Sequence, residues 1–582
     1  MRRFIVGLLA TIGFLTLVFW IGVAAWLSTG PFASKPLPQP IVLELDLRSV
    51  PAETTVGSML GLQGSRDIVD TIQLIWQAAD DSRVKGMFVE IGDESAGLAR
   101  VQELREAIAR FRGKGKFAIG FAQSLGNGSH FADYYLASAL DQIWLQPSGD
   151  FMVAGIAVET PFLRTALDKV GIQVEGGKRW QYKSAPDTFL ETGYTAPARQ
   201  NLDQLLNSLF DQFVADVSRE RHLEPAKLRQ LIDSVPLDAE HAEKEKLVDK
   251  LGYRADALDE AWKRSDNKTH DLTSLNDYAG DDSRPKPHGE VIGLVRVSGA
   301  ISSGGASTGP LDDDNAANSE DVVDALDQAV KAKDVKAILL RIDSPGGTYP
   351  AADAIADAVG RARSAGKPVI VSMGDVAASG GYLAAVRGDV IVAEPTTNTA
   401  SIGVFSIWPV ASQLLTSLGV SVDRLKVGTN AGMYSPFQAP TEAQKAAVDR
   451  QLDTIYNAFT GEVSQFRKLD GEKLDAAARG RVFSGNDAKK AGLIDELGGL
   501  QLALNIAKAK AGIDEAKSIE LRRYPPESER WQKIIDRVMR LFGVETDGTV
   551  RAPREVREAL ARFGIVAHPG NVRLPPLPPL WH

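Results

Sequence analysis

A serine in a glycine-rich turn is the feature of this sequence with the clearest capacity for chemistry. Residues 374–382 read GDVAASGGY, follow an apolar run typical of a buried strand, and precede the helix-like run YLAAVRG. Ser379 is therefore expected at a strand-to-helix turn, where unpaired backbone N–H groups favour negative charge and Gly380 lets a substrate approach closely. This setting suits a nucleophile, although a purely structural glycine-rich turn gives the same pattern.

A second glycine-rich turn is expected beside the first. Residues 343–347 read DSPGG and follow the apolar run Ala337–Ile342, so they should lie at the carboxyl end of a buried strand, where α/β sheets gather their ligand sites. The backbone N–H groups of Gly347 and Gly380 together would form an oxyanion hole, in which one donor contributes about 3 to 4 kcal/mol.

The base that would activate Ser379 is expected to be a lysine. No histidine lies between His288 and His568, which excludes a local Ser/His pair, and His130 in the first half remains only as an alternative. Lys183 lies in WQYKSAP, where Trp180 and Tyr182 supply an apolar setting. To act near neutral pH, its pKa must fall from about 10.4 to about 7 or 8, a change that burial produces.

Composition narrows the remaining classes of function. The 582 residues carry a net charge of −9 and contain no dense run of basic residues, which argues against a nucleic-acid partner. The chain has no cysteine, so disulfides, thiolate catalysis and cysteine-ligated zinc are all excluded. A chain of 582 residues is longer than one hydrophobic core usually supports, so several domains are expected.

The amino terminus predicts a membrane anchor. The run from Phe4 to Leu27 contains no charged residue and follows Arg2 and Arg3. At about 1.5 Å per residue a helix of this length spans about 36 Å, enough for a hydrocarbon core of about 30 Å. Positive charge before the span places the amino end in the cytoplasm and the body across the membrane. A cleaved signal peptide is the alternative.

The body of the chain is predicted to be a duplication. GIQVE at Gly171 matches GVSVD at Gly419, a spacing of 248 residues, and Pro147 and Pro395 keep the same spacing. LVDKLG at Leu247 likewise resembles LIDELG at Leu493. A repeat of this length indicates two copies of one domain rather than a solenoid. The expected divisions are an anchor at 1–33, a first repeat at 34–266, a linker at 267–290, a second repeat at 291–517 and an extension at 518–582.

Each half alternates strand-like and helix-like segments. Apolar runs such as Ala337–Ile342 and Pro368–Ser372 are separated by helical patterns such as Ala351–Ala365. This alternation predicts an α/β fold in which parallel sheets are covered by helices.

These motifs together resemble the long, duplicated form of the signal peptide peptidase A (SppA) family, which are Ser/Lys proteases on a ClpP/crotonase-like fold. DSPGG, GDVAASGGY and YKSAP each stand in the expected place. The resemblance implies that Ser379 is the nucleophile, that Lys183 is the general base, and that Ser401 in NTASIG orients the lysine. It also implies a homotetramer on the periplasmic or outer side of a membrane, peptide substrates such as signal peptides, and no metal or organic cofactor.

Duplication accounts for the separation of 196 residues between Lys183 and Ser379. Matching YL at 135–136 with YL at 382–383 puts Ala132 opposite Ser379, and the 248-residue spacing puts Ala431 opposite Lys183. Each half would then keep one member of the pair, as expected for a site assembled between two diverged copies. Asp343 stands where the family often has asparagine, so its role is open.

Two other functions are compatible with parts of this pattern. A crotonase-like acyl-CoA enzyme would use a comparable oxyanion hole, but an exported body would not meet cytosolic CoA. A catalytically inactive membrane scaffold would require a broken site, whereas the serine, the lysine and the glycines are all present.

Overall fold

The structure is a computed structural model that describes residues 37–54, 66–92, 96–126, 131–304, 316–526, 549–550 and 572–573. These residues form two compact units. Unit 1 takes its described residues from Met1–Phe162, Arg199–Lys286 and Glu394–Thr397, and unit 2 from Leu163–Ala198, Pro287–Ala393 and Asn398–His582. The expected membrane anchor lies outside the described residues, and none of the helices within them is long and apolar enough to cross a membrane.

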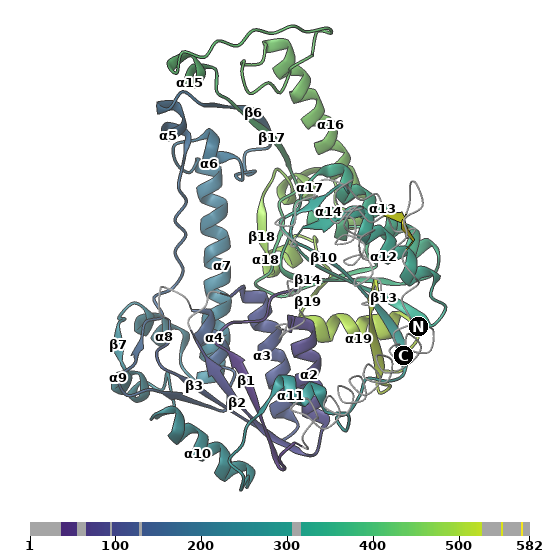
Figure 1. The fold of residues 1–582 in the computed structure, drawn as a ribbon. Coiled ribbons are helices and arrows are strands. Elements are labelled where there is room, and N and C mark those ends of the chain that lie inside the picture. The colour runs from purple at the N-terminus through teal and green to yellow at the C-terminus, as the bar shows by residue number, and fades with distance from the viewer. Residues whose placement is uncertain are drawn as a thin grey trace, which may run out of the picture. The chain divides into compact units, whose positions relative to one another are not determined.

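Unit 1 is built on a parallel sheet of six strands in the order β8-β4-β3-β2-β1-β9 (Figure 1). The strands are β1 (Ile41–Leu47), β2 (Val84–Ile91), β3 (Phe117–Ala122), β4 (Gln142–Leu145), β8 (Lys250–Leu251) and β9 (Thr273–Ser274). The helices between them are α2 (Ile68–Asp80), α3 (Leu98–Gly113), α4 (Ala132–Ala137), α7 (Ala196–Arg221), α8 (Pro225–Ile232), α9 (Ala239–Lys244) and α10 (Arg254–Ser265), and α11 (Leu275–Gly280) follows β9.

Both faces of this sheet are buried. On one face, each of the three central strands contributes a side chain that packs against Ala257 and Ala261 of α10. These side chains are Val42 of β1, Phe88 of β2 and Ile119 of β3. Their neighbours along β1 and β2 are also buried, and side chains that alternate along a strand point to opposite faces. A sheet covered on both sides explains why these strands read as continuous apolar runs.

Unit 2 is built on a larger sheet with the path β18-β16-β14-β13-β10-β20, and β15 pairs with β14 and β19. All pairs are parallel except β16 with β18. The strands are β10 (Glu290–Ser298), β13 (Val335–Ser344), β14 (Val369–Ala378), β15 (Val390–Ala393), β16 (Asn398–Ala400), β18 (Val482–Ser484), β19 (Glu496–Leu497) and β20 (Ile519–Tyr524). The expectation of a mixed α/β fold with parallel sheets is therefore confirmed.

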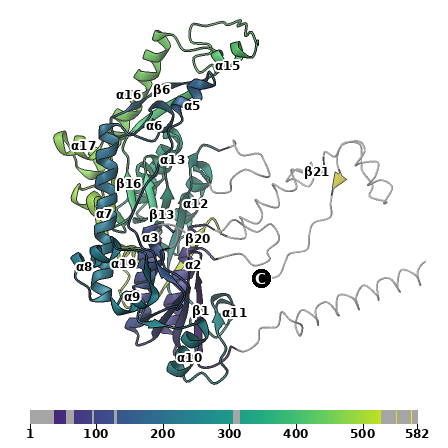
Figure 2. The same cartoon turned by 90° about the vertical axis from the view of Figure 1, so that its left-hand side faces the viewer.

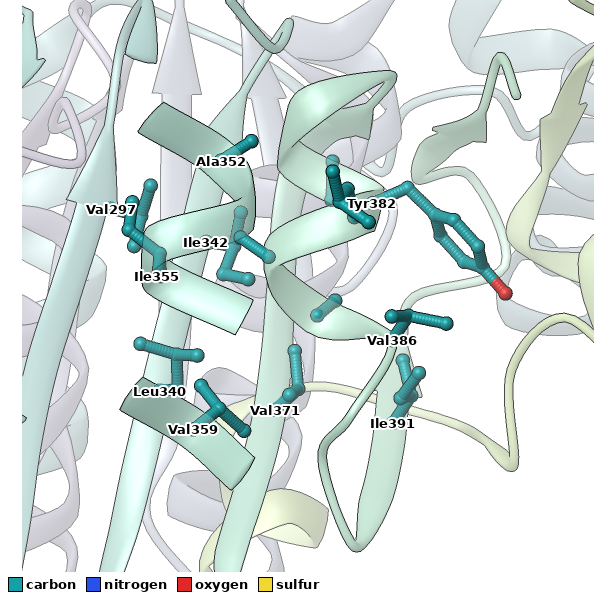
Figure 3. Close-up of a cluster of buried hydrophobic side chains, with 14 of the residues drawn as sticks. Val297, Leu340, Ile342, Ala352, Ile355, Val359, Val371, Tyr382, Val386 and Ile391 are labelled. Carbon is teal, nitrogen blue, oxygen red and sulfur yellow. The ribbon is translucent and has the colours of Figure 1, made fainter. Parts of the chain in front are cut away.

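Helices α12 (Ser319–Lys331), α13 (Tyr349–Ser364), α14 (Gly380–Ala385) and α19 (Leu500–Lys510) belong to this unit. Figure 3 shows Ile355 and Val359 of α13 against Leu340 and Ile342 of β13, within one buried apolar cluster. The inner face of α13 is rich in alanine, so the helix can approach the sheet closely. This packing fixes the ends of β13 and β14, where the two glycine-rich turns begin.

Matching tertiary contacts reveal the correspondence between the two units. The Tyr134 hydroxyl donates to the carbonyl of Leu247 at 2.9 Å, and the Tyr382 hydroxyl donates to that of Leu493 at 2.7 Å. Helices α4 and α14 follow equivalent strands and begin 248 positions apart. The residue equivalent to Ser379 is therefore Phe131, and the assignment of Ala132 from the YL match is wrong by one position. The sequence match failed because the motif contains two adjacent tyrosines.

One segment of the first half belongs to unit 2. Strand β6 (Gln173–Arg179) pairs antiparallel with β17 (Val404–Val410), and α16 (Glu442–Arg467) contacts both strands (Figures 1 and 2). The Arg179 guanidinium bridges to the carboxylates of Asp449 and Asp453 on α16. Because of this ribbon, the residues that follow β6 share a unit with Ser379.

Candidate active site

Ser379 stands at the junction of β14 and α14, as the sequence predicts. It caps the helix with φ of 54° and ψ of −117°, a conformation that non-glycine residues rarely adopt. The turn is held from the strand side, because the Ser379 N–H donates to the carbonyl of Ala400 at 2.7 Å. Strained backbone of this kind is often found at functional sites, where the surrounding structure enforces it.

Lys183 reaches this serine from the loop that follows β6. Its side chain is 3% exposed, and its Nζ lies 2.9 Å from Ser379 Oγ. The same Nζ lies 3.0 Å from both Oγ and the carbonyl oxygen of Ser401. Lys183, Ser379 and Ser401 lie in three separate segments of the sequence, and the structure brings their side chains together.

Burial changes the chemistry of this lysine. Loss of solvation lowers the pKa of Lys183 from 10.5 to about 8, and no carboxylate opposes the shift. An amine with this pKa is neutral in roughly a tenth of molecules at pH 7 and in half of them near pH 8. The group is therefore suited to accept a proton close to neutral pH.

The three oxygen atoms around Nζ fit both protonation states. An ammonium has three N–H donors, and three acceptors surround it. A neutral amine has two donors and one lone pair, so Ser401 can take both donors while the lone pair faces the Ser379 hydroxyl. Ser401 itself is held by its N–H, which donates to the Arg481 carbonyl at 2.9 Å.

A loop at residues 478–481 supports the lysine and was not identified from the sequence. The Gly480 N–H donates to the carbonyl of Ile402 at 2.7 Å, and the Arg479 carbonyl accepts from the N–H of Tyr182 at 3.1 Å. A Cβ on Gly480 would lie 2.6 Å from the Lys183 Cα, so only glycine fits there. Nothing in the local sequence ARGRV signals this role, since the contact is made only in the folded chain.

The proposed oxyanion donors also lie at this site. A Cβ on Gly380 would lie 3.0 Å from the Gly347 backbone N, so the two glycine backbones face each other. Gly346 has φ of +101°, and a Cβ there would lie 2.6 Å from the Gly380 N. Glycine is required here because the DSPGG turn packs directly against the backbone of the turn that carries Ser379.

Two side chains of the DSPGG motif hold that turn. The buried Ser344 hydroxyl donates to the Gly299 carbonyl at 2.6 Å and accepts from the Gly346 N–H at 3.1 Å. Asp343 Oδ1 accepts from the Val376 N–H at 2.9 Å, at the irregular step between β13 and β14. An asparagine side-chain oxygen could accept the same hydrogen bond, so this contact does not depend on the charge of Asp343.

The alternative base, His130, lies outside the described residues. In the described structure, Lys183 Nζ lies within hydrogen-bond distance of Ser379 Oγ. No group of acidic or histidine side chains in the described part of the chain is arranged to hold a metal ion.

Comparison with known proteins gives matches that cover both candidate residues. A family model described as Peptidase family S49 matches residues 122–268 and 361–514. The first match contains Lys183, and the second contains Ser379 and Ser401. Together the two matches span more than half of the chain.

Individual relatives carry consistent names. Protease 4 from Salmonella typhi is 31% identical over 546 residues, covering 89% of this chain and 85% of that protein. Serine protease SPPA, chloroplastic, from Arabidopsis thaliana is 29% identical and covers 76% of this chain and 66% of that protein. The putative signal peptide peptidase SppA from Enterococcus faecium is 31% identical over 205 residues, covering 35% of this chain and 60% of that protein.

Proposed function

The chain belongs to peptidase family S49, and from that premise we propose that Ser379 and Lys183 form the catalytic dyad of a serine-type peptidase. The observation that carries the proposal is the 2.9 Å distance between Lys183 Nζ and Ser379 Oγ, with the lysine buried. A buried lysine with a lowered pKa beside a strained serine is the arrangement that Ser/Lys catalysis requires.

The mechanism follows from these contacts. Neutral Lys183 removes the hydroxyl proton of Ser379 as Oγ forms a bond to the peptide carbonyl carbon, and the carbonyl oxygen becomes an oxyanion. The N–H groups of Gly347 and Gly380 stabilise that oxyanion. The Lys183 ammonium then protonates the leaving amine as the C–N bond breaks, which leaves an acyl-enzyme. The same lysine, neutral again, removes a proton from water as the water oxygen bonds to the acyl carbon. The C–Oγ bond then breaks, and the Lys183 ammonium returns the proton to Ser379 Oγ.

The substrates that we propose are hydrophobic peptides such as released signal peptides. A relative bears the name putative signal peptide peptidase SppA, and that name supports the assignment. Trp180 also supports it, because this side chain is 45% exposed three residues from the lysine and provides apolar contact area.

The setting of the activity is part of the proposal. The charge-free run Phe4–Leu27 after two arginines supports a single-pass anchor in the inner membrane, with the peptidase body on the periplasmic side. Membership of the family supports a ClpP/crotonase-like fold and a homotetramer. Resistance of the full chain to alkaline extraction from membranes, combined with protease access from the outer side only, is the expected result for the anchor.

Peptide hydrolysis by the full chain in detergent tests the dyad. Ser379→Ala and Lys183→Met are each expected to reduce kcat by at least about 10³-fold with the fold intact, because each removes an essential partner. Lys116→Met is a matched control. The pKa of Lys116 is also lowered to about 8 by burial, but its Nζ donates to backbone carbonyls of Ala78 and Asp81.

The outcomes of this comparison separate the possible functions. Loss of activity in both dyad variants, with the Lys116 variant near wild type, is the expected result. Near-wild-type turnover by Lys183→Met would reject the lysine as base and turn attention to His130. A wild-type protein that hydrolyses none of a varied set of hydrophobic peptides would favour the scaffold function.

A further inference from the structure

One face of helix α16 contacts the chain around Lys183 at two places. Asp449, Asp453 and Tyr456 follow one another at spacings of four and three residues, which places their side chains on the same face of the helix. The two carboxylates bind the guanidinium of Arg179 at 3.1 and 2.5 Å. The hydroxyl of Tyr456 accepts a hydrogen bond from the Arg479 N–H at 3.2 Å. The same face therefore binds the end of β6 and the loop at residues 478–481.

These two contacts flank the segment that carries Lys183. We call residues 180–186 the lysine loop, which runs from β6 to α6 (Asp187–Leu190), and residues 478–481 the supporting loop. The Arg479 carbonyl accepts from the N–H groups of Trp180 at 3.4 Å and Tyr182 at 3.1 Å, both in the lysine loop. The backbone of Arg479 is therefore bound by Tyr456 on one side and by the lysine loop on the other.

Arg479 needs this support because its backbone is strained. It has φ of 61°, in the left-handed region that residues with a Cβ rarely adopt. A conformation of this kind persists only where the surrounding contacts enforce it. The Tyr456 hydroxyl binds the N–H of this residue, so loss of the hydroxyl would let the turn relax and carry the Arg479 carbonyl away from the lysine loop.

The ring of Tyr456 also supports the lysine loop directly. It packs edge to face on Trp180, with the ring centroids 6.0 Å apart and the planes at 89°. The Trp180 carbonyl accepts from the Lys183 N–H at 3.1 Å, so this contact reaches the backbone of the lysine. Burial raises the pKa of the Tyr456 hydroxyl, so the group stays neutral where Lys183 titrates.

The first half of the chain provides an internal comparison. Helices α7 and α16 both have 26 residues and end 246 positions apart, at Arg221 and Arg467. This spacing puts Phe210 in the place of Tyr456. The copy that has Phe131 in the place of Ser379 therefore also has a phenylalanine in the place of Tyr456. A tyrosine hydroxyl occurs where the Ser/Lys pair occurs and is absent where that pair is absent.

We propose that Tyr456 is a positioning residue, whose hydroxyl holds the supporting loop and thereby keeps Lys183 Nζ within reach of Ser379 Oγ. It acts through Arg479 and the lysine loop rather than on the reacting atoms. The proposal rests on the proposed function, because it concerns the geometry of the dyad. Displacement of the lysine slows proton transfer and leaves substrate binding nearly unchanged, so the effect belongs in kcat.

Hydrolysis of hydrophobic peptides by the full chain in detergent tests this role. Tyr456→Phe keeps the ring against Trp180 and removes only the hydroxyl, so kcat should fall about 10-fold while KM and the thermal unfolding midpoint change little. Tyr434→Phe is the matched control. Tyr434 also packs edge to face on a tryptophan, and its hydroxyl also binds α16, where it donates to Gln451 Oε1 at 3.2 Å. The kcat of this control should stay within about twofold of wild type.

Hydrogen–deuterium exchange, read by mass spectrometry, reports on the loops without any substrate. In Tyr456→Phe, peptides that cover the supporting loop and the lysine loop should exchange faster than in the wild type, and in Tyr434→Phe they should not. A second substitution links the effect to Lys183. Gly480→Ala already displaces the supporting loop, so adding Tyr456→Phe to it should lower kcat by much less than about 10-fold.

The proposal would be overturned by wild-type kcat in Tyr456→Phe, by an equal loss in Tyr434→Phe, by a change confined to KM, or by the full loss in the Gly480→Ala chain. A wild-type chain that hydrolyses none of the peptides would contradict the proposed function, and the exchange measurement then decides alone. Faster exchange limited to Tyr456→Phe would still support the hold on the lysine loop, and unchanged exchange would overturn it.

Discussion

At the scale of single residues, the site depends on how Lys183 is solvated. Its ammonium has three oxygen acceptors but no carboxylate partner among the groups that shift its pKa. Desolvation therefore favours the neutral amine without a counter-charge to reverse it. Burial also lowers the pKa of Lys116, but the partners of its Nζ are backbone carbonyls, which have no proton to give.

This setting predicts how activity depends on pH. The base must be neutral to accept a proton, and a lysine is neutral above its pKa, so kcat/KM should rise with pH through about 8 and then level off. The measurement is kcat/KM between pH 6 and 10, with circular dichroism at each pH to exclude unfolding. A rate that is flat across this range, or that falls between pH 7 and 9, would contradict Lys183 as the base.

At the scale of elements, the proposed Ser379/Lys183 dyad is held by loops that contribute no reacting atoms. The loop at residues 478–481 binds both the Lys183 loop and the turn before β17 through backbone hydrogen bonds. Ser344 similarly holds the DSPGG turn against the end of β10. These contacts set the distance from Nζ to Oγ to within the small tolerance that proton transfer needs.

Gly480→Ala tests this positioning. The added Cβ would meet the Lys183 backbone and shift the lysine, so kcat should fall by about 10²-fold or more while KM changes little. The measurement is the separation of kcat from KM, together with the thermal unfolding midpoint. Gly461→Ala is a suitable control, because a Cβ there meets no described atom within 4 Å. Wild-type kcat in Gly480→Ala would show that the lysine tolerates displacement.

At the scale of the whole molecule, the two residues of the proposed dyad come from different halves of the chain. Lys183 comes from the first half of the chain and Ser379 from the second. Both lie in unit 2, because the segment Leu163–Ala198 belongs to that unit. Phe131 in the first half corresponds to Ser379, and Ala431 in the second half corresponds to Lys183. Neither of these side chains has a hydroxyl or an amine. The described structure of one chain therefore contains one pair of Lys183 and Ser379 in contact.

Mixing two inactive variants tests whether the dyad is completed within a chain. Lys183→Met chains co-expressed with Ser379→Ala chains should remain inactive, because the Nζ–Oγ contact joins residues of one chain. The measurement is peptide hydrolysis by the co-purified mixture, with the wild-type chain as reference. Recovery of a substantial fraction of wild-type activity would mean that Lys183 reaches Ser379 of another copy.

The sequence by itself determined the family and the parallel α/β fold, and it singled out Ser379 and Lys183 as candidate reacting residues. Buried strands are continuous apolar runs, and glycine-rich turns at their carboxyl ends are local features that short motifs reveal. No histidine lies between His288 and His568, and this absence from the sequence around Ser379 pointed to lysine as the base. Even the 248-residue spacing could be read from a few matched positions.

Only the tertiary structure decided how these parts meet. The correspondence of Phe131 rather than Ala132 to Ser379 rests on a hydrogen bond from Tyr134 to the distant Leu247, which adjacent tyrosines conceal in the sequence. The role of Gly480 depends on a contact with Lys183 across nearly 300 positions of chain. Burial lowers the pKa of Lys183 through the atoms packed around it, and those atoms come from segments whose meeting no local pattern encodes.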